Sequence, residues 1–327
     1  MKSYDFGQFL FNSAFLDEEK LFDLALATKN KTATLATKAL FLGMVALPDL
    51  KNLAESESVE DFLRTHDSEV QGKYDEKIKG ILKPNQIARL GRLKESSSVW
   101  ILQELIDDGT IDAAQIEKLL TDYQNLEMSP LEQAFSERYE TLPPENKPDY
   151  QLAMEVVKSF HDFASDSFGS TIILLPDSEP AEEKLLGATV KVKGKMPVIV
   201  GLFAPEDVFL QFAQRYNNLA EDVNDAFDVI SEFLNIYAGH LTIQFVATTG
   251  NEEEPETPRH GEVENFSAIK MLSDWGKFYL YVGTEEYFST SVSQPTNDLD
   301  ELGDLSQFGL ADFDDDFDEK FKDPFDF

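Results

Sequence analysis

The sequence predicts a protein of mixed α/β class, in which an all-helical N-terminal region precedes a domain of long helices packed on a mainly antiparallel sheet. Three observations predict this. Leucine, alanine and charged residues recur at helical spacing up to about residue 145, a proline-rich segment follows, and the last residues are strongly acidic. We therefore expect a helical scaffold or interaction domain at 1–145, the sheet-containing domain at 148–292, and a disordered acidic tail at 293–327.

Helix-start signals mark the N-terminal region. Asp17 precedes two glutamates and Asp112 precedes two alanines and a glutamine, and an Asp at such a position caps the free amides of a first turn. The apolar pattern around Asp17 recurs around Asp112, 95 residues later, and a weaker echo begins at Leu40. This recurrence indicates short helical hairpins, either duplicated or merely alike in their leucine content.

The segment 141–148 reads as a linker because its three prolines remove helical amide donors. Beyond it the periodicity changes. We expect helices at 150–168, 206–216 and 220–237, and strands at 170–175, 187–193, 197–203, 241–249, 266–272 and 277–282.

Composition excludes several classes of function. The chain has 62 acidic and 28 basic residues, a net charge of −34, and such a chain is repelled by nucleic acid and by anionic membranes. It has no cysteine, so disulfides and thiolate chemistry are excluded. No apolar run approaches the roughly 20 residues that span a bilayer. We expect a cytoplasmic protein without membrane insertion or nucleic-acid binding.

The acidic tail contains a regular series of phenylalanines. Phe313, Phe317, Phe321 and Phe325 are four residues apart and would share one face of a helix if a partner supplied a groove. The alternative is a solubilising tail in which the aromatic residues are incidental. Neither interpretation identifies a partner.

Residues for catalysis are scarce. None of the four histidines has metal-site spacing, and there is no nucleophile-elbow, phosphate-loop or dinucleotide-binding motif. We therefore expect a structural or surface role for each histidine.

The informative segment is the helix expected around residues 223–239. Its apolar stripe predicts a buried face, whereas Asp228, Glu232 and Asn235 are spaced i, i+4 and i+7 and project nearly opposite that stripe, toward solvent. Exposed groups of this kind cannot form a desolvated pocket alone. They could be inserted into the active site of another protein.

Asp228, Glu232, Asn235 and Pro258 satisfy a motif of Asp or Ser, three residues, Glu, two residues, Asn, 22 residues and Pro. With this motif, the segment of about 148–290 resembles the CheX, CheC and FliY group of bacterial chemotaxis phosphatases. The motif occurs once, as in CheX. The resemblance implies a CheX-like domain and does not reach the N-terminal half or the tail.

The resemblance implies dephosphorylation of the phosphoaspartate on a CheY-like response regulator. Asn235 would orient the attacking water and Glu232 would pair with a lysine of the regulator, and these two residues are the predicted catalytic pair. Asp228 and Pro258 would support them. The Mg²⁺ ion would belong to the phosphorylated regulator, and no cofactor would be bound by this chain.

Two alternatives stay open. The chain could be a non-catalytic adaptor that binds a regulator or a signalling complex, or the helical region could be the principal functional module while the C-terminal domain dimerises it. Members of the family can pair through the sheet, so a homodimer is also an open alternative. The sequence identifies neither the target regulator nor the partners of the N-terminal helices and the tail.

Overall fold

The computed structural model describes residues 6–284 except 28–32, 55–57, 65–66, 93–96, 143–146, 177–180, 182, 251–253 and 265. The acidic tail at 293–327, its phenylalanines and the linker prolines Pro143 and Pro144 lie outside the described residues. The predictions made for them stay predictions.

The described residues up to Thr141 form helices and the turns between them. The first strand of the described chain begins at Ile173. The helices are α1 Phe6–Asn12, α2 Glu18–Ala27, α3 Leu35–Phe41, α4 Leu47–Ala54, α5 Val59–Arg64, α6 Ser68–Ile81, α7 Pro84–Arg92, α8 Ser97–Asp107, α9 Ala113–Gln124 and α10 Pro130–Thr141. Both predicted helix starts are confirmed, because Asp17 accepts a hydrogen bond from the Lys20 amide and Asp112 forms a reciprocal cap with Gln115.

The same turn follows three of these helices, α1, α3 and α8. The second residue after each helix has a positive φ, which is 53° at Ala14, 63° at Gly43 and 76° at Gly109. The amide two residues later donates back to the helix in each case, in the pairs Leu16 to Leu10, Val45 to Ala39 and Ile111 to Leu105. Glycine adopts this φ without steric cost, and Ala14 is the exception. The predicted recurrence therefore appears as a repeated local geometry.

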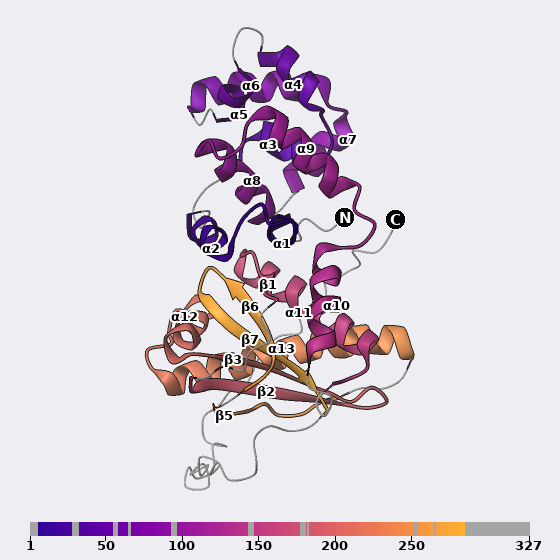
Figure 1. The fold of residues 1–327 in the computed structure, drawn as a ribbon, viewed down its shortest axis with the longest axis vertical. Coiled ribbons are helices and arrows are strands. Elements are labelled where there is room, and N and C mark those ends of the chain that lie inside the picture. The colour runs from indigo at the N-terminus through magenta and orange to yellow at the C-terminus, as the bar shows by residue number, and fades with distance from the viewer. Residues whose placement is uncertain are drawn as a thin grey trace, which may run out of the picture. The chain divides into compact units, whose positions relative to one another are not determined.

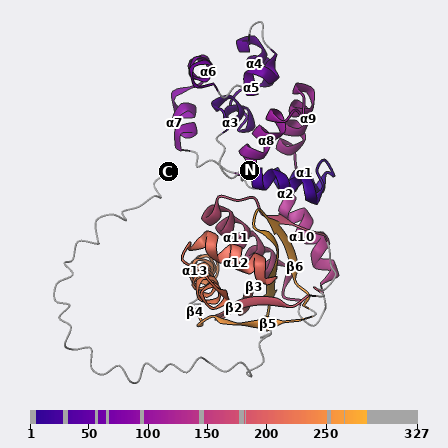
Figure 2. The ribbon, with the colours of Figure 1, turned by 90° about the vertical axis from the view of Figure 1, so that its left-hand side faces the viewer.

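The C-terminal part combines an antiparallel sheet with long helices, which confirms the predicted fold class (Figures 1 and 2). The sheet order is β1-β6-β7-β3-β2-β4, and β5 also pairs with β2. The strands are β1 Ile173–Leu174, β2 Leu185–Lys193, β3 Val198–Ala204, β4 Glu254–Pro255, β5 Arg259–Val263, β6 Ile269–Ser273 and β7 Gly276–Gly283. The helices are α11 Tyr150–Phe168, α12 Glu206–Tyr216 and α13 Val223–Thr249.

One predicted strand is wrong, and strand β5 is absent from the prediction. The strand expected at 241–249 is the last part of α13, because Leu241 and Phe245 are fully buried and continue the buried stripe of Tyr237 at four-residue intervals. This segment contains several β-branched residues, which are common in strands, and they favoured the prediction of a strand. Strand β5 was missed because its mostly polar sequence gives no hydrophobic alternation.

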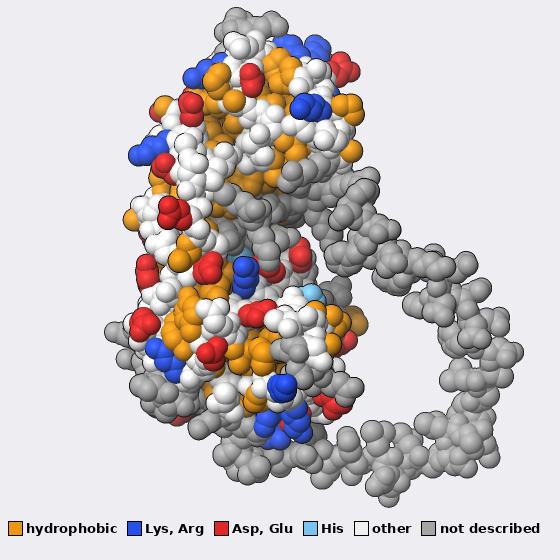
Figure 3. Space-filling model, turned by 90° about the vertical axis from the view of Figure 1, so that its right-hand side faces the viewer, with side chains coloured by type: hydrophobic (Ala, Val, Ile, Leu, Met, Phe, Trp, Pro, Cys, Tyr) orange, Lys and Arg blue, Asp and Glu red, His pale blue; other side chains and the backbone are white. Residues whose placement is uncertain are grey.

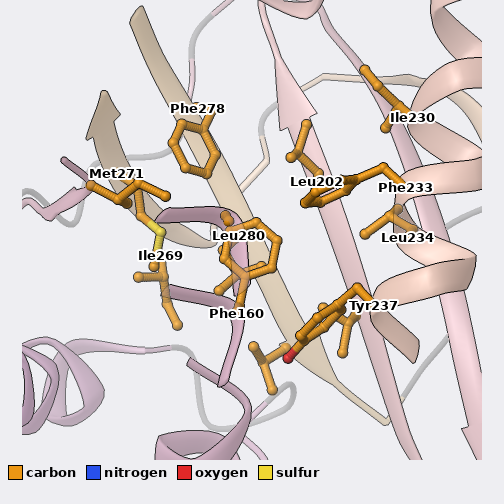
Figure 4. Close-up of a cluster of buried hydrophobic side chains, with 14 of the residues drawn as sticks. Phe160, Leu202, Ile230, Phe233, Leu234, Tyr237, Ile269, Met271, Phe278 and Leu280 are labelled. Carbon is orange, nitrogen blue, oxygen red and sulfur yellow. The ribbon is translucent and has the colours of Figure 1, made fainter. Parts of the chain in front are cut away.

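The main core lies between one face of the sheet and the helices α11, α12 and α13. Figure 4 shows the part of it in which Phe160 of α11 and Phe233 of α13 lie against the sheet. Val200 and Leu202 of β3 lie in this core, whereas their neighbours Ile199 and Phe203 belong to a smaller cluster on the other face. The alternation follows from the period of two in a strand. Phe160 of α11 packs edge-on against Tyr237 of α13, with ring centroids 5.4 Å apart.

Helix α10 precedes the linker in sequence but shares this core. Phe135 is fully buried there, and the Arg138 guanidinium donates a 2.9 Å hydrogen bond to the carbonyl of Ala268. The division into domains at 1–145 and 148–292 stays a prediction. Any fragment that begins at residue 148 would lack these contacts.

Edge strand β1 is capped by a side chain of α1. The buried Gln8 carboxamide donates to the Leu174 carbonyl at 3.0 Å and accepts from the Leu174 amide at 2.7 Å. These are the two hydrogen bonds that a neighbouring strand would supply. Gln8 therefore closes the sheet edge at β1 to further strand pairing.

Candidate functional site

The candidate site lies on α13, which is long and firmly anchored. The Asp222 carboxylate caps its first turn by accepting hydrogen bonds from the amides of Asn224 and Asp225, and Gly250 ends it in a left-handed conformation. On the buried side, the Tyr237 hydroxyl donates a 2.9 Å hydrogen bond to the Val156 carbonyl of α11. Burial raises the pKa of Tyr237, so this phenol stays a neutral donor.

Asp228, Glu232 and Asn235 lie on the opposite side of the helix, and all three are exposed. In the part of the chain that the structure describes, their side chains make no hydrogen bond or ion pair. The next helical positions toward the sheet, Val229 and Phe233, are buried. The structure therefore presents three exposed polar groups on a helix whose opposite side is buried in the core.

Tyr216, at the end of α12, is an additional residue beside this line. Its ring packs edge-on against Phe233, with centroids 5.2 Å apart, and also contacts Phe168. Partial burial and the nearby Glu232 carboxylate raise the pKa of Tyr216. The half-buried phenol is thus a protonated hydrogen-bond donor next to Glu232. Nothing in the sequence pointed to Tyr216, because only the packing of α12 against α13 brings the two residues together.

A buried ion pair fixes the end of α12 where Tyr216 lies. The guanidinium of Arg215 contacts the Asp274 carboxylate at 2.8 Å and donates to the Ser170 hydroxyl at 2.9 Å. Asp274 is only 5% exposed. This pair connects α12 to the β6–β7 hairpin and to the segment after α11.

Pro258 lies between β4 and β5, at a break in strand register. Val192 of β2 pairs with Pro255, but Thr189 pairs with Arg259, so two residues of β2 face three residues of the neighbouring segment. This is the arrangement of a β-bulge. Proline has no amide hydrogen to donate, and a bulge at an edge tolerates it.

The segment after Pro258 reaches the first half of α13. The His260 ring stacks on Phe227, with centroids 4.7 Å apart and an interplanar angle of 22°, and Phe227 adjoins Asp228. The structure therefore brings the Pro258 loop to the same end of α13 as Asp228. Within the described residues no hydrogen bond joins Pro258 to Glu232 or Asn235.

Within the described ranges, no three carboxylate or imidazole side chains gather closely enough to hold a metal ion. Of the helices described, none is long and apolar enough to span a bilayer.

No family model and no curated protein matches the chain. Solved structures do match it. CheX from Desulfovibrio desulfuricans is 14% identical and CheX from Vibrio vulnificus 12%, and each match covers 41% of this chain and 99% of the other, with a TM-score of 0.33. A CheX–CheY complex with BeF3 and Mg from Borrelia burgdorferi is 13% identical, and this match covers 41% of this chain and 97% of that one, with a TM-score of 0.29.

The predicted motif consists of Asp228, Glu232, Asn235 and Pro258. The roles assigned to those four residues stay predictions. The matched structures are those of CheX- and CheC-like chemotaxis proteins, and each match covers 41% of this chain.

Proposed function

We propose that this chain dephosphorylates the phosphoaspartate of a CheY-like response regulator by inserting Glu232 and Asn235 into the regulator's active site. One observation carries the proposal: Asp228, Glu232 and Asn235 form an exposed line along one helix, whose opposite side is buried in the core. Such groups can act only in a site that a partner completes. The motif supplies the class of partner.

Asn235 would position the attacking water. Its carboxamide can accept one hydrogen bond and donate another, so it can hold a water molecule in line with the phosphorus atom. The regulator already holds the acyl phosphate, a lysine and its Mg²⁺, so water alignment is the missing contribution. An amide does not titrate, and Asn235 would orient the water without removing a proton from it.

Glu232 would set the docking register by pairing with the regulator's lysine. The Tyr216 phenol beside it can donate a hydrogen bond to one carboxylate oxygen and leave the other for the lysine. Asp228, one turn earlier, adds a second negative charge on the same line. Pro258 shapes the neighbouring loop.

The test measures steady-state phosphate release from a panel of phosphorylated response regulators of the same organism, together with a binding titration. We expect Asn235→Ala to lower kcat by about 100-fold or more, as the loss of one oriented amide does in other enzymes. Its free energy of unfolding should change by no more than about 0.5 kcal/mol, because Asn235 is exposed. Glu232→Ala should weaken binding as well as rate.

Asn224→Ala is the matched control, since Asn224 is an exposed asparagine in the first turn of the same helix, eleven residues before Asn235 and too far along the helix to reach the same water molecule. It should leave kcat unchanged. If Asn235→Ala turns over as fast as the parent, the catalytic proposal is wrong. If the parent binds a regulator but accelerates no phosphate release, the adaptor function takes its place.

A further inference from the structure

The second half of α13 exposes large apolar side chains on the same face as the proposed site. Ile236 is 46% exposed, Ile243 70% and Val246 40%. Ile243 lies eight residues and Val246 eleven residues beyond Asn235, so both continue the line of Asp228, Glu232 and Asn235 around the 3.6-residue turn. We call Ile236, Ile243 and Val246 the apolar half of the α13 surface.

A glycine lies between the polar line and the apolar half. Gly239 follows Asn235 by four residues and precedes Ile243 by four, and a Cβ atom built on it would meet nothing within 4 Å. Glycine inside a helix costs about 0.5–1 kcal/mol relative to alanine. No packing within the described part of the chain requires it, whereas close approach by another molecule would.

The first half of α13 and the turn before it are acidic. Glu221, Asp222, Asp225, Asp228 and Glu232 are all exposed, and α13 contains no lysine or arginine. Asp222 and Asp225 make capping hydrogen bonds with backbone amides and keep their charge exposed. The exposed face of α13 is therefore acidic at one end and apolar at the other.

This arrangement argues against a second copy and against the chain's own tail. Two α13 helices paired antiparallel would place the acidic half of each on the apolar half of the other and desolvate unpaired charges. Parallel pairing would set carboxylates against carboxylates. The tail from residue 294 contains twelve acids and two lysines, so the acidic half repels it.

The arrangement fits a partner that has a cationic centre next to an apolar surface. The rise of 1.5 Å per residue places Ile243 about 16 Å along the helix from Glu232. Resting on the proposed function, we propose that the apolar half of α13 is the docking surface for the rim of the response regulator's active site, with Gly239 admitting a side chain of the regulator. Glu232 and Asn235 then enter the active site beside that rim.

The experiment compares the full-length parent with the double variant Ile236→Gln/Ile243→Gln, which keeps good helix formers and removes exposed apolar surface. In steady-state phosphate release from the phosphorylated regulator, KM should rise about tenfold or more and kcat should stay within about twofold. Gly239→Ala should raise KM as well. Ile81→Gln is the matched control, because Ile81 is a helical residue with 47% exposure outside the C-terminal region; it should leave KM unchanged.

The outcomes separate this proposal from the proposed function. If the parent is active and the double variant keeps the parental KM, the docking surface is wrong while the phosphatase function stands. If the parent shows no turnover, the dissociation constant for the regulator with Mg²⁺ and beryllofluoride replaces KM, and a tenfold loss in the double variant supports the docking surface. Absence of both turnover and binding overturns both proposals.

Sedimentation velocity of the same variants tests whether a second copy of this chain binds the apolar half of α13. The proposal expects the same sedimentation coefficient for the parent and the double variant. A parent dimer that becomes a monomer in the double variant, with KM unchanged, would assign the apolar half to a second copy and overturn the proposal.

Discussion

The two faces of α13 differ in what each contributes. On the buried face, Phe233 and Tyr237 pack against α11 and α12, and Tyr237 is also hydrogen-bonded to α11. On the exposed face, Asp228, Glu232 and Asn235 make no side-chain hydrogen bond within the described part of the chain. The buried face holds the helix rigid. The exposed face keeps its hydrogen-bonding capacity for another molecule.

This difference teaches how an exposed site can be precise without a pocket. A group on a free surface loop would have to be ordered when the partner binds, and that ordering costs free energy. A helix fixed along its buried face presents its exposed side chains at constant spacing before the partner arrives. Substitutions on the buried face should therefore change stability, and substitutions on the exposed face should change activity.

Phe233→Ala should give the largest change in stability. Phe233 is fully buried and its ring contacts the rings of Phe160, Phe168, Phe212 and Tyr216. We expect the free energy of unfolding to fall by about 3–5 kcal/mol, measured by urea denaturation. A loss below about 1 kcal/mol would contradict the view that this face anchors the helix.

Arg215→Met should give the second largest loss in the free energy of unfolding. It leaves the Asp274 carboxylate buried without its cation, and breaking a pair of this kind costs about 3 kcal/mol. Because the pair fixes the end of α12, regulator binding should weaken too, through displacement of Tyr216. The double variant Arg215→Met/Asp274→Asn should recover part of the lost stability. If it recovers none, the ion pair is not the origin of the loss.

Tyr237→Phe should cost about 1 kcal/mol, the net contribution of one hydrogen bond, because it leaves the Val156 carbonyl without the phenol donor. Turnover measured well below the unfolding temperature should equal that of the parent. A drop in turnover at unchanged stability would mean that the two faces are not independent.

The sequence predicted the helical and sheet-containing regions and the two faces of α13, because both depend on local periodicity. Asp228, Glu232 and Asn235 could be placed together on one exposed face because they belong to one helix. Tyr216 could not be found, since it reaches Glu232 only through the packing of two helices. The prediction of a strand at 241–249 is wrong, because burial of this segment as part of a helix outweighs the weak strand preference of its residues.

The turns at Ala14, Gly43 and Gly109 show a related limit. The sequence shows the recurrence around Asp17 and Asp112. The similarity at Leu40 is too weak to predict that all three turns have the same backbone geometry. Gln8 is a further case. Its role in capping β1 depends on a partner 166 residues away in the sequence, which no local pattern contains.

Tyr216→Phe should change stability least. It tests the comparison most sharply, because Tyr216 of α12 lies beside Glu232 of the exposed face, whereas Tyr237 lies on the buried face. The ring contacts with Phe168 and Phe233 persist in phenylalanine, so the free energy of unfolding should change by no more than about 0.5 kcal/mol. Loss of the hydroxyl should leave Glu232 less well oriented and raise KM for the phosphorylated regulator about threefold, with kcat unchanged. If Tyr216 acts through Glu232, the same substitution should have no effect on KM in a Glu232→Ala background. Equal effects in both backgrounds would show that Tyr216 contacts the regulator directly and does not position Glu232.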